Sequence, residues 1–182
     1  QITMKASAPK PIASVPRADL DRLLDEEAVM WRNELCWSFE PTRARLENAL
    51  GEGILTGFAV TDDEGACAYA TYSVNDGQGI VGSFFTSARV RGLGFESALV
   101  GQILDRLVPL RLRVIDGQTL FSSDPGLKAP FVERGFESAS RVYMTLESSG
   151  WPPSGGAAGT ATRSQPIHRT DLGSVTRLVY HA

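Results

Sequence analysis

The residues whose types and spacing best support chemistry lie in one short run, Arg89-Val90-Arg91-Gly92-Leu93-Gly94. Glycine lets the backbone adopt conformations that a Cβ disfavours and lets it pass close to a ligand. The run precedes an expected helix, whose first four N–H groups have no intrahelical partner and carry partial positive charge. The sequence therefore predicts that this turn binds an oligophosphate through its backbone, with Arg89 and Arg91 adding positive charge at the rim.

Two common phosphate-binding motifs do not fit this turn. The Walker loop needs G-x-x-x-x-G-K-[ST], and the turn has no Lys or Ser/Thr at those places. The dinucleotide fingerprint G-x-G-x-x-G matches only at Gly92 and Gly94, because Ser97 stands where the third glycine belongs. That fingerprint also requires a parallel βαβ unit, whereas the segments upstream of the turn are typical of hairpins. Both nucleotide motifs are excluded on these grounds.

The elements that must position the turn follow from periodicity and turn residues. Residues 80–85 predict a strand, and apolar residues at helical spacing from Leu99 to Leu107 predict a helix that Pro109 ends. Upstream, residues 54–61 and 66–74 alternate as hairpin strands around the turn 62–65, so we expect an antiparallel meander. Further expected elements are helices at 19–31, capped by Asp19, at 42–50 and at 127–134, an edge strand near 12–15, and strands within 112–121, interrupted at Asp116-Gly117, and at 141–146.

Composition narrows the class of protein. With 182 residues, 42% hydrophobic and 21% charged, the chain has globular values and room for one ordinary domain. The net charge of −3 argues against a nucleic-acid partner, which would need a basic face. Cys36 and Cys67 give neither a disulfide framework nor metal-ligand spacing, and no apolar run predicts a membrane span or signal peptide. We therefore expect a cytoplasmic protein without a metal, a nucleic-acid partner or a membrane association.

Three features together resemble the GCN5-related N-acetyltransferases (GNAT family). The first is R-x-x-G-x-G between a strand and a helix, and the second is a short aromatic helix that ends in Gly135-Phe136. The third is the order of elements, which agrees from about residue 15 to 147. The resemblance implies the acyl-CoA N-acyltransferase fold, an α/β fold of the α+β type whose mixed, mostly antiparallel sheet is flanked by helices.

The resemblance also implies acetyl-CoA as co-substrate. By position, the backbone of Val90, Arg91, Gly92, Leu93, Gly94 and Phe95 would hold the CoA diphosphate. Gly82, Ser83 and Phe84, on the strand before the turn, would pair with the pantetheine arm and place the thioester. Asp124 falls where relatives carry an Asn beside the pantetheine, although a helix cap before Pro125 is the alternative reading.

Catalytic residues do not carry over in the same way. The family's acid is a Tyr before Gly-Phe, where this chain has Phe131 or Val132, and its usual carboxylate position falls near Thr119. Both histidines, His168 and His181, lie beyond the matched region. Substitute donors would be Tyr69, Tyr72 or Tyr143, and substitute bases Glu40 or Glu47. Two functions remain open: direct acetyl transfer to a small-molecule or peptide amine, or a non-catalytic CoA-binding or structural module.

The expected organisation has four parts. Residues 1–16 are a lead-in segment or edge strand, and residues 17–148 are the acetyltransferase-like domain. Residues 149–165, rich in Pro, Gly, Ser, Ala and Thr, predict a flexible linker. Residues 166–182 resemble the start of a truncated second acetyltransferase-like domain, or a helix that docks back on the first. A tandem partner domain or a homodimer is the corresponding assembly that the resemblance implies.

Overall fold

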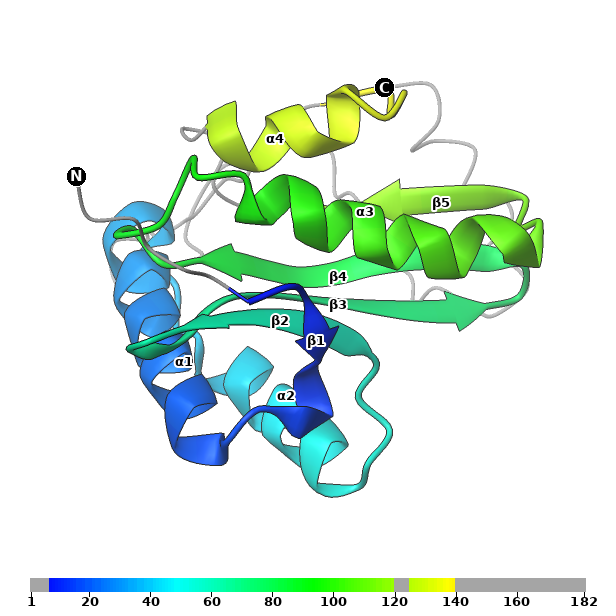
Figure 1. Cartoon of the computed structure of the whole chain (residues 1–182). Helices are drawn as coiled ribbons and strands as arrows, with labels where there is room; N and C mark the ends of the chain where they lie inside the picture. The colour runs from blue at the N-terminus through cyan, green and yellow to red at the C-terminus, as the bar shows by residue number, and fades with distance from the viewer. Residues whose placement is uncertain (1–6, 120–124, 140–182) are drawn as a thin grey trace, which may run out of the picture. The chain divides into compact units, whose positions relative to one another are not determined.

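A single sheet organises the residues that the structure, a computed structural model, describes: 7–119 and 125–139. Within these residues the sheet has five strands in the order β1-β2-β3-β4-β5. Its first four strands pair antiparallel and β5 pairs parallel to β4 (Figure 1). The strands are β1 (Lys10–Pro11), β2 (Gly57–Asp62), β3 (Gly65–Asn75), β4 (Gln78–Thr86) and β5 (Val114–Gly117). The predicted mostly antiparallel sheet and its meander are confirmed.

Two details of the sheet differ from the expectation. The edge strand lies at Lys10–Pro11, and the predicted segment starts with a 3-10 turn, Ile12–Ser14, whose Ile12 side chain is buried. Asp116-Gly117 does not interrupt β5 but belongs to it, paired with Ile80 and Val81. The Asp116 carboxylate accepts a hydrogen bond from the Gln78 side chain, so tertiary pairing outweighs the turn propensity of Asp-Gly here.

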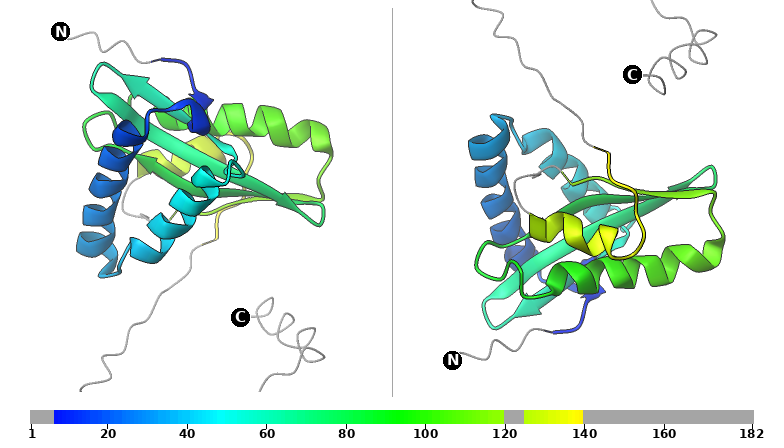
Figure 2. Two further views of the ribbon diagram at one scale, coloured as in Figure 1. Left: turned by 90° about the horizontal axis from the view of Figure 1, so that it is seen from below. Right: turned by 90° about the horizontal axis from the view of Figure 1, so that it is seen from above.

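Helices cover both faces of the sheet. Figure 2 shows α1 and α2 over one face and α3 and α4 over the other. The helices are α1 (Arg17–Met30), followed by a π-helical turn (Trp31–Leu35), then α2 (Glu40–Gly51), α3 (Phe95–Leu107) and α4 (Pro125–Val132). The predicted 141–146 strand lies outside the described residues.

The starts of α1 and α2 depart from the sequence prediction because of proline. Pro16, not Asp19, is the N-cap residue of α1, and its carbonyl accepts the amides of Asp19 and Leu20 at 3.0 and 3.2 Å. The Asp19 carboxylate instead pairs with Arg22 at 2.5 Å. Helix α2 begins at Glu40 and includes Pro41 in its first turn, where the missing N–H of proline has no bond to make.

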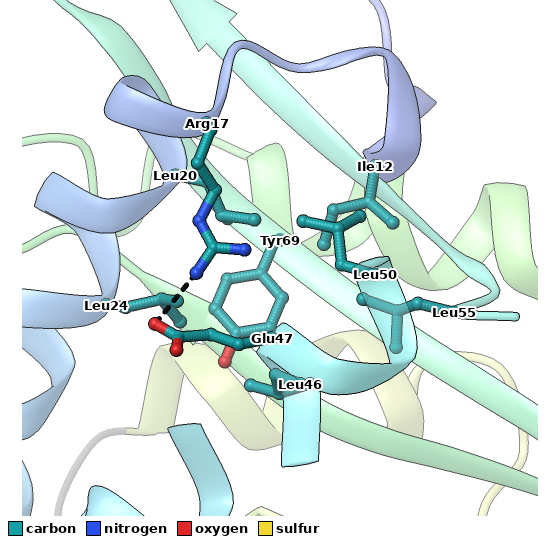
Figure 3. Close-up of a pocket in the computed structure, with 9 residues that line it drawn as sticks. All are labelled: Ile12, Arg17, Leu20, Leu24, Leu46, Glu47, Leu50, Leu55 and Tyr69. Atoms are coloured by element: carbon teal, nitrogen blue, oxygen red, sulfur yellow. Dashed lines mark ion pairs between the residues drawn. The ribbon is translucent and has the colours of Figure 1, made fainter. Parts of the chain in front are cut away.

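The core between the sheet and α1–α2 is closely packed. Figure 3 shows the Tyr69 ring of β3 among leucines of both helices, beneath the 2.8 Å ion pair of Arg17 with Glu47. The cavity that these side chains line has a volume of about 10 Å³. That volume is at the lower limit for one water molecule, so this space is a packing defect and not a ligand site.

A glycine in β2 gives a direct test of this packing. A Cβ on Gly57 would lie 2.5 Å from the Ala70 carbonyl oxygen, a backbone atom. We expect Gly57→Ala to lower the free energy of unfolding by about 1–3 kcal/mol in urea denaturation, as overpacked cores do. Gly51→Ala is the matched control, since a Cβ there meets nothing within 4 Å. Equal stability of the two variants would contradict the β2–β3 register.

Candidate active site

The turn between β4 and α3 has the backbone conformation that its glycines permit. Gly92 and Gly94 have φ of 77° and 92°, and a Cβ at either position would meet no atom within 4 Å. Gly94 is the N-cap residue of α3, and no described side chain caps this helix. The first-turn amides of Phe95, Glu96 and Ser97 therefore point out of the helix beside open space, which is the geometry of an anion site.

Several amides of the turn itself are already bonded. The Val90 amide donates to the Ser87 carbonyl at 3.1 Å, and the Leu93 amide donates to the Val90 carbonyl at 3.2 Å. The Gly92 amide donates at 3.2 Å to Oε1 of Glu96, whose side chain is buried. These internal bonds occupy three amides of the predicted cradle 90–95, those of Val90, Gly92 and Leu93. The amides that face outward therefore lie toward the start of α3.

The two arginines of the motif brace the turn against neighbouring elements. Arg89 pairs with Asp62, at the end of β2, through two contacts of 2.5 and 2.9 Å, and this guanidinium lowers the pKa of the Asp62 carboxyl. Arg91 donates to the Thr86 carbonyl and contacts the sulfur of Met30 in α1, both at 3.1 Å. Glu26 of α1 accepts the Ala88 amide at 2.7 Å. The turn is thus held on β2 and on α1.

The predicted pantetheine strand, Gly82 to Phe84, lies just beyond the end of a strand pair. Pairing of β4 with β5 runs from Gln78 to Val81 and stops there. The register of β4 against β3 also shifts at this point, opposite Thr71, and a Cβ on Gly82 would lie 2.8 Å from the Thr71 hydroxyl. Among residues 7–119 and 125–139, the pairing of β4 with β5 therefore does not extend to Gly82, Ser83 and Phe84.

The expected acid position holds an apolar ring. Phe131 is buried and packs edge-on against Phe84 and Phe136, with ring centroids 5.7 and 5.3 Å apart. Its ring also covers Gly117, where a Cβ would lie 2.6 Å away. The neighbouring Val132 side chain is exposed. Neither residue can donate a proton, so an acid or base of this site must come from elsewhere.

The sequence analysis missed a buried carboxylate in α1. Glu27 of α1 is 3% exposed, and its Oε2 accepts the Tyr69 hydroxyl at 2.6 Å while its Oε1 accepts Nε1 of Trp31 at 3.1 Å. Burial raises the pKa of Glu27 to about 7 against the lowering effect of these two hydrogen bonds. Burial and Glu27 hold the pKa of Tyr69 well above its usual value, and the nearby Ser83 side chain acts to lower it.

The sequence did contain a signal for Glu27. The residue continues the apolar stripe of α1, three and four positions after Leu24 and Leu23, so a charged residue stands on the core face. Glu96 gives the same signal, three positions before Leu99 on the buried face of α3. A carboxylate on an apolar stripe indicates a buried group with a partner from another element, which one helix's periodicity cannot identify.

The remaining candidates fall in different places. Tyr72 stacks on Phe58 at 6.2 Å on the α3 side of the sheet, and Glu47 is engaged by Arg17 and Arg43 at 2.8 and 2.9 Å. Glu40 is exposed at the start of α2. Thr119 is half-buried. Asp124 and Tyr143 lie outside the described residues.

An open pocket of about 460 Å³ lies at the connection between α1 and α2. Trp37 and Phe39 line it, and their rings lie 6.3 and 5.2 Å from that of Trp31, the indole that donates to Glu27. Glu40 and Arg32 add charge to the lining. Trp31 thus contacts both aromatic residues of the pocket wall and also donates to the buried carboxylate of Glu27.

Two classes of site have no support in the described part of the chain. Residues 7–119 and 125–139 contain no group of three His, Cys, Asp or Glu side chains placed to hold a metal ion. Among the same residues, no helix combines the length and apolar character that crossing a membrane requires.

Comparison with known proteins gives no family model and no curated relative that matches this sequence. Solved structures do match. A GCN5-related N-acetyltransferase from Ralstonia eutropha is 14% identical, over 79% of this chain and 98% of its own, with a TM-score of 0.54. A predicted acetyltransferase with acetyl-CoA from Clostridium acetobutylicum is 11% identical, over 79% and 96%, with a TM-score of 0.53.

The aminoglycoside acetyltransferase AAC(6')-Iy, in complex with the bisubstrate analogue CoA-S-monomethyl-acetylneamine, is 15% identical over 79% of this chain and 98% of its own. Its TM-score is 0.52. At identities this low, the comparison establishes that the folds are alike and nothing finer. The sheet order, the turn before α3 and the helices on both faces agree with that likeness. This chain therefore has the acyl-CoA N-acyltransferase fold of the GCN5-related N-acetyltransferases, the family that its sequence resembles.

Proposed function

We propose that this protein transfers an acetyl group from acetyl-CoA to a primary amine of a small molecule by direct attack of the amine. The observation that carries the proposal is the uncapped start of α3 behind Gly92 and Gly94. Charge-assisted hydrogen bonds contribute roughly 1.5–3 kcal/mol each. Three outward amides are therefore enough to hold a diphosphate without a metal ion.

The rest of the co-substrate fits the neighbouring strand. A pantetheine arm has amide groups that can pair with main-chain groups of Gly82 to Phe84, beyond the end of the β4–β5 pairing. The thioester would then lie near Ser83. Asp124, expected beside this arm or as a helix cap, stays a proposal.

The acceptor site in this proposal is the pocket between α1 and α2. Its aromatic wall of Trp37 and Phe39 and the carboxylate of Glu40 suit a cationic amine with apolar surface. Solved structures of similar fold include aminoglycoside acetyltransferases, which supports a small-molecule acceptor over a protein. Both cysteines are free thiols, and Cys36 is exposed, so we place the reaction in the reducing cytoplasm.

A non-catalytic CoA-binding module is the second candidate, and Phe131 favours it. The loss of a positioned acid or base costs on the order of 10²–10⁴ in rate. A tandem partner domain or a homodimer would then supply the activity that this domain lacks.

Calorimetric titration with acetyl-CoA tests the proposal. We expect a Kd between about 1 μM and 1 mM, the usual range of KM. Incubation with acetyl-CoA and kanamycin, spermidine or a tripeptide, followed by mass spectrometry, should then show an acetylated amine. Mass detection avoids thiol reagents, which would also react with the exposed Cys36. No binding at millimolar acetyl-CoA would refute the proposal, and binding without transfer would select the non-catalytic module.

A further inference from the structure

Three polar side chains lie in a row from the predicted thioester strand to the interior. Ser83 belongs to β4, Tyr69 to β3 and Glu27 to α1. The Tyr69 hydroxyl donates to Glu27 at 2.6 Å, and the Ser83 side chain lies near enough to act on the pKa of Tyr69. Tyr69 and Glu27 are buried, whereas Ser83 is half-buried. One end of the row thus lies at the candidate site and the other in the core.

The donors and acceptors of these three side chains can be ordered in one direction. The Tyr69 proton is engaged by Glu27, so the Tyr69 oxygen is left to accept the Ser83 hydroxyl proton. The other Glu27 oxygen accepts from Trp31, whose indole can only donate. Each proton therefore points from the strand toward the Glu27 carboxylate. An inward path from Ser83 needs two transfers, the second along the 2.6 Å bond from Tyr69 to Glu27, whereas Trp31 cannot receive a proton.

We propose that Ser83, Tyr69 and Glu27 form a proton relay that deprotonates the acceptor ammonium before it attacks the thioester. This inference rests on the proposed acetyl transfer. Ser83 touches the amine, and Tyr69 and Glu27 act through it. The relay supplies the base that Thr119, at the family's usual carboxylate position, cannot provide.

The proposed step balances in atoms and charge. An N–H bond of the ammonium breaks and its proton forms an O–H bond on Ser83, as the Ser83 proton passes to Tyr69 and the Tyr69 proton to Glu27. The carboxylate becomes a neutral acid and the amine becomes neutral. The amine then attacks the thioester carbon, the C–S bond breaks, and the CoA thiolate takes the second proton that the nitrogen loses. Glu27 later releases its proton to solvent by the same path.

The charged groups around α1 do not replace Glu27 in this role. Arg43 and Glu47 of α2 pair with each other and with Asp25 and Arg17 of α1. In the turn before α3, Arg91 contacts Met30 of α1. From the sheet, Tyr69 and Ser83 are the hydroxyl groups of the row described above. The pKa of Glu27, about 7, lies where a general base works best at neutral pH.

Rate profiles against pH test the relay. The substrates are acetyl-CoA and whichever of kanamycin, spermidine and the tripeptide is acetylated. With these, kcat/KM of the wild-type protein should rise with pH, with a midpoint near pH 7. Glu27→Gln should remove that rise and lower kcat/KM on the order of 10²-fold. Tyr69→Phe and Ser83→Ala should each lower kcat/KM on the same order. Tyr72→Phe is the matched control, because Tyr72 lies on the same strand as Tyr69 but does not belong to the relay. It should keep the wild-type profile.

Two further measurements separate the relay from folding and from cofactor binding. Tyr69→Phe keeps the ring in the core, so its circular dichroism and its acetyl-CoA affinity should stay at wild-type values. Tryptophan fluorescence without any ligand should titrate near pH 7 in the wild type, because Trp31 donates to Glu27, and should lose this transition in Glu27→Gln.

The outcomes distinguish the two proposals. Wild-type turnover with unchanged profiles in Glu27→Gln and Tyr69→Phe would overturn the relay and leave the acetyltransferase function intact. Acetyl-CoA binding without turnover of any amine would overturn the relay and leave the CoA site. Failure of the wild type to bind acetyl-CoA would overturn both.

Discussion

Replacing Gly94 with glutamate is expected to weaken acetyl-CoA binding by about 100-fold or more, or roughly 2.7 kcal/mol. The N-cap position of α3 opens onto empty space, and a side chain there would place a carboxylate at the proposed diphosphate site. The new charge would repel the diphosphate and occupy the first-turn amides by capping the helix. Gly92→Glu should act in the same direction. Isothermal titration calorimetry with acetyl-CoA measures both changes.

Gly53→Glu is the matched control for this experiment. Gly53 also has a positive φ, 69°, and a Cβ there would meet no atom within 4 Å, but it follows α2 and not the turn before α3. It therefore carries the same backbone strain and the same added charge without touching the candidate site. Equal affinities of Gly94→Glu and Gly53→Glu would show that acetyl-CoA binds elsewhere.

Glu27 is expected to make the stability of the protein depend on pH between about 4.5 and 7. Its pKa rises on folding from 4.5 to about 7, so the folded state binds the proton more tightly than the unfolded state. The associated stability is complete below pH 4.5 and is lost as the pH rises through 7. A shift of this size corresponds to about 3 kcal/mol. Urea denaturation at several pH values measures it.

Comparison with Glu27→Gln isolates this contribution. The Gln variant does not titrate at this position, so its free energy of unfolding should gain about 3 kcal/mol relative to wild type between pH 4 and pH 8. Other groups cancel in the difference, including Asp62, whose lowered pKa has the opposite effect on stability at low pH. A difference that stays constant over this range would mean that water reaches Glu27 and that its pKa is ordinary.

Much of the fold could be predicted because its signals are local. The Asp76-Gly77 pair is typical of a hairpin turn, and both residues adopt positive φ between β3 and β4. Helix α3 followed from the spacing of Leu99, Ile103 and Leu107, all buried. Where local signals competed with distant partners, prediction failed: Gly117, expected to interrupt a strand, is paired with Val81 and covered by Phe131.

In the candidate site, too, the local features could be predicted and the distant contacts could not. The glycines of the turn before α3 were identified from type and spacing, because positive φ is a property of the residue and its immediate neighbours. The partners of Arg89 and Arg91 were not, since Asp62 and Met30 lie 27 and 61 positions away in the chain. Neither was the contact of Tyr69 with Glu27, which joins residues 42 apart.

The sequence by itself determined the glycine-containing turn before α3, the helix behind it and the antiparallel meander, because glycine torsions and hydrophobic periodicity act within a few residues. Only the tertiary structure decided which side chains meet beside that turn. Folding places Glu27 of α1 against Tyr69 of β3, and the burial that raises the pKa of Glu27 to about 7 exists only once α1 covers the sheet. Desolvation is a property of the packed molecule and of no single segment.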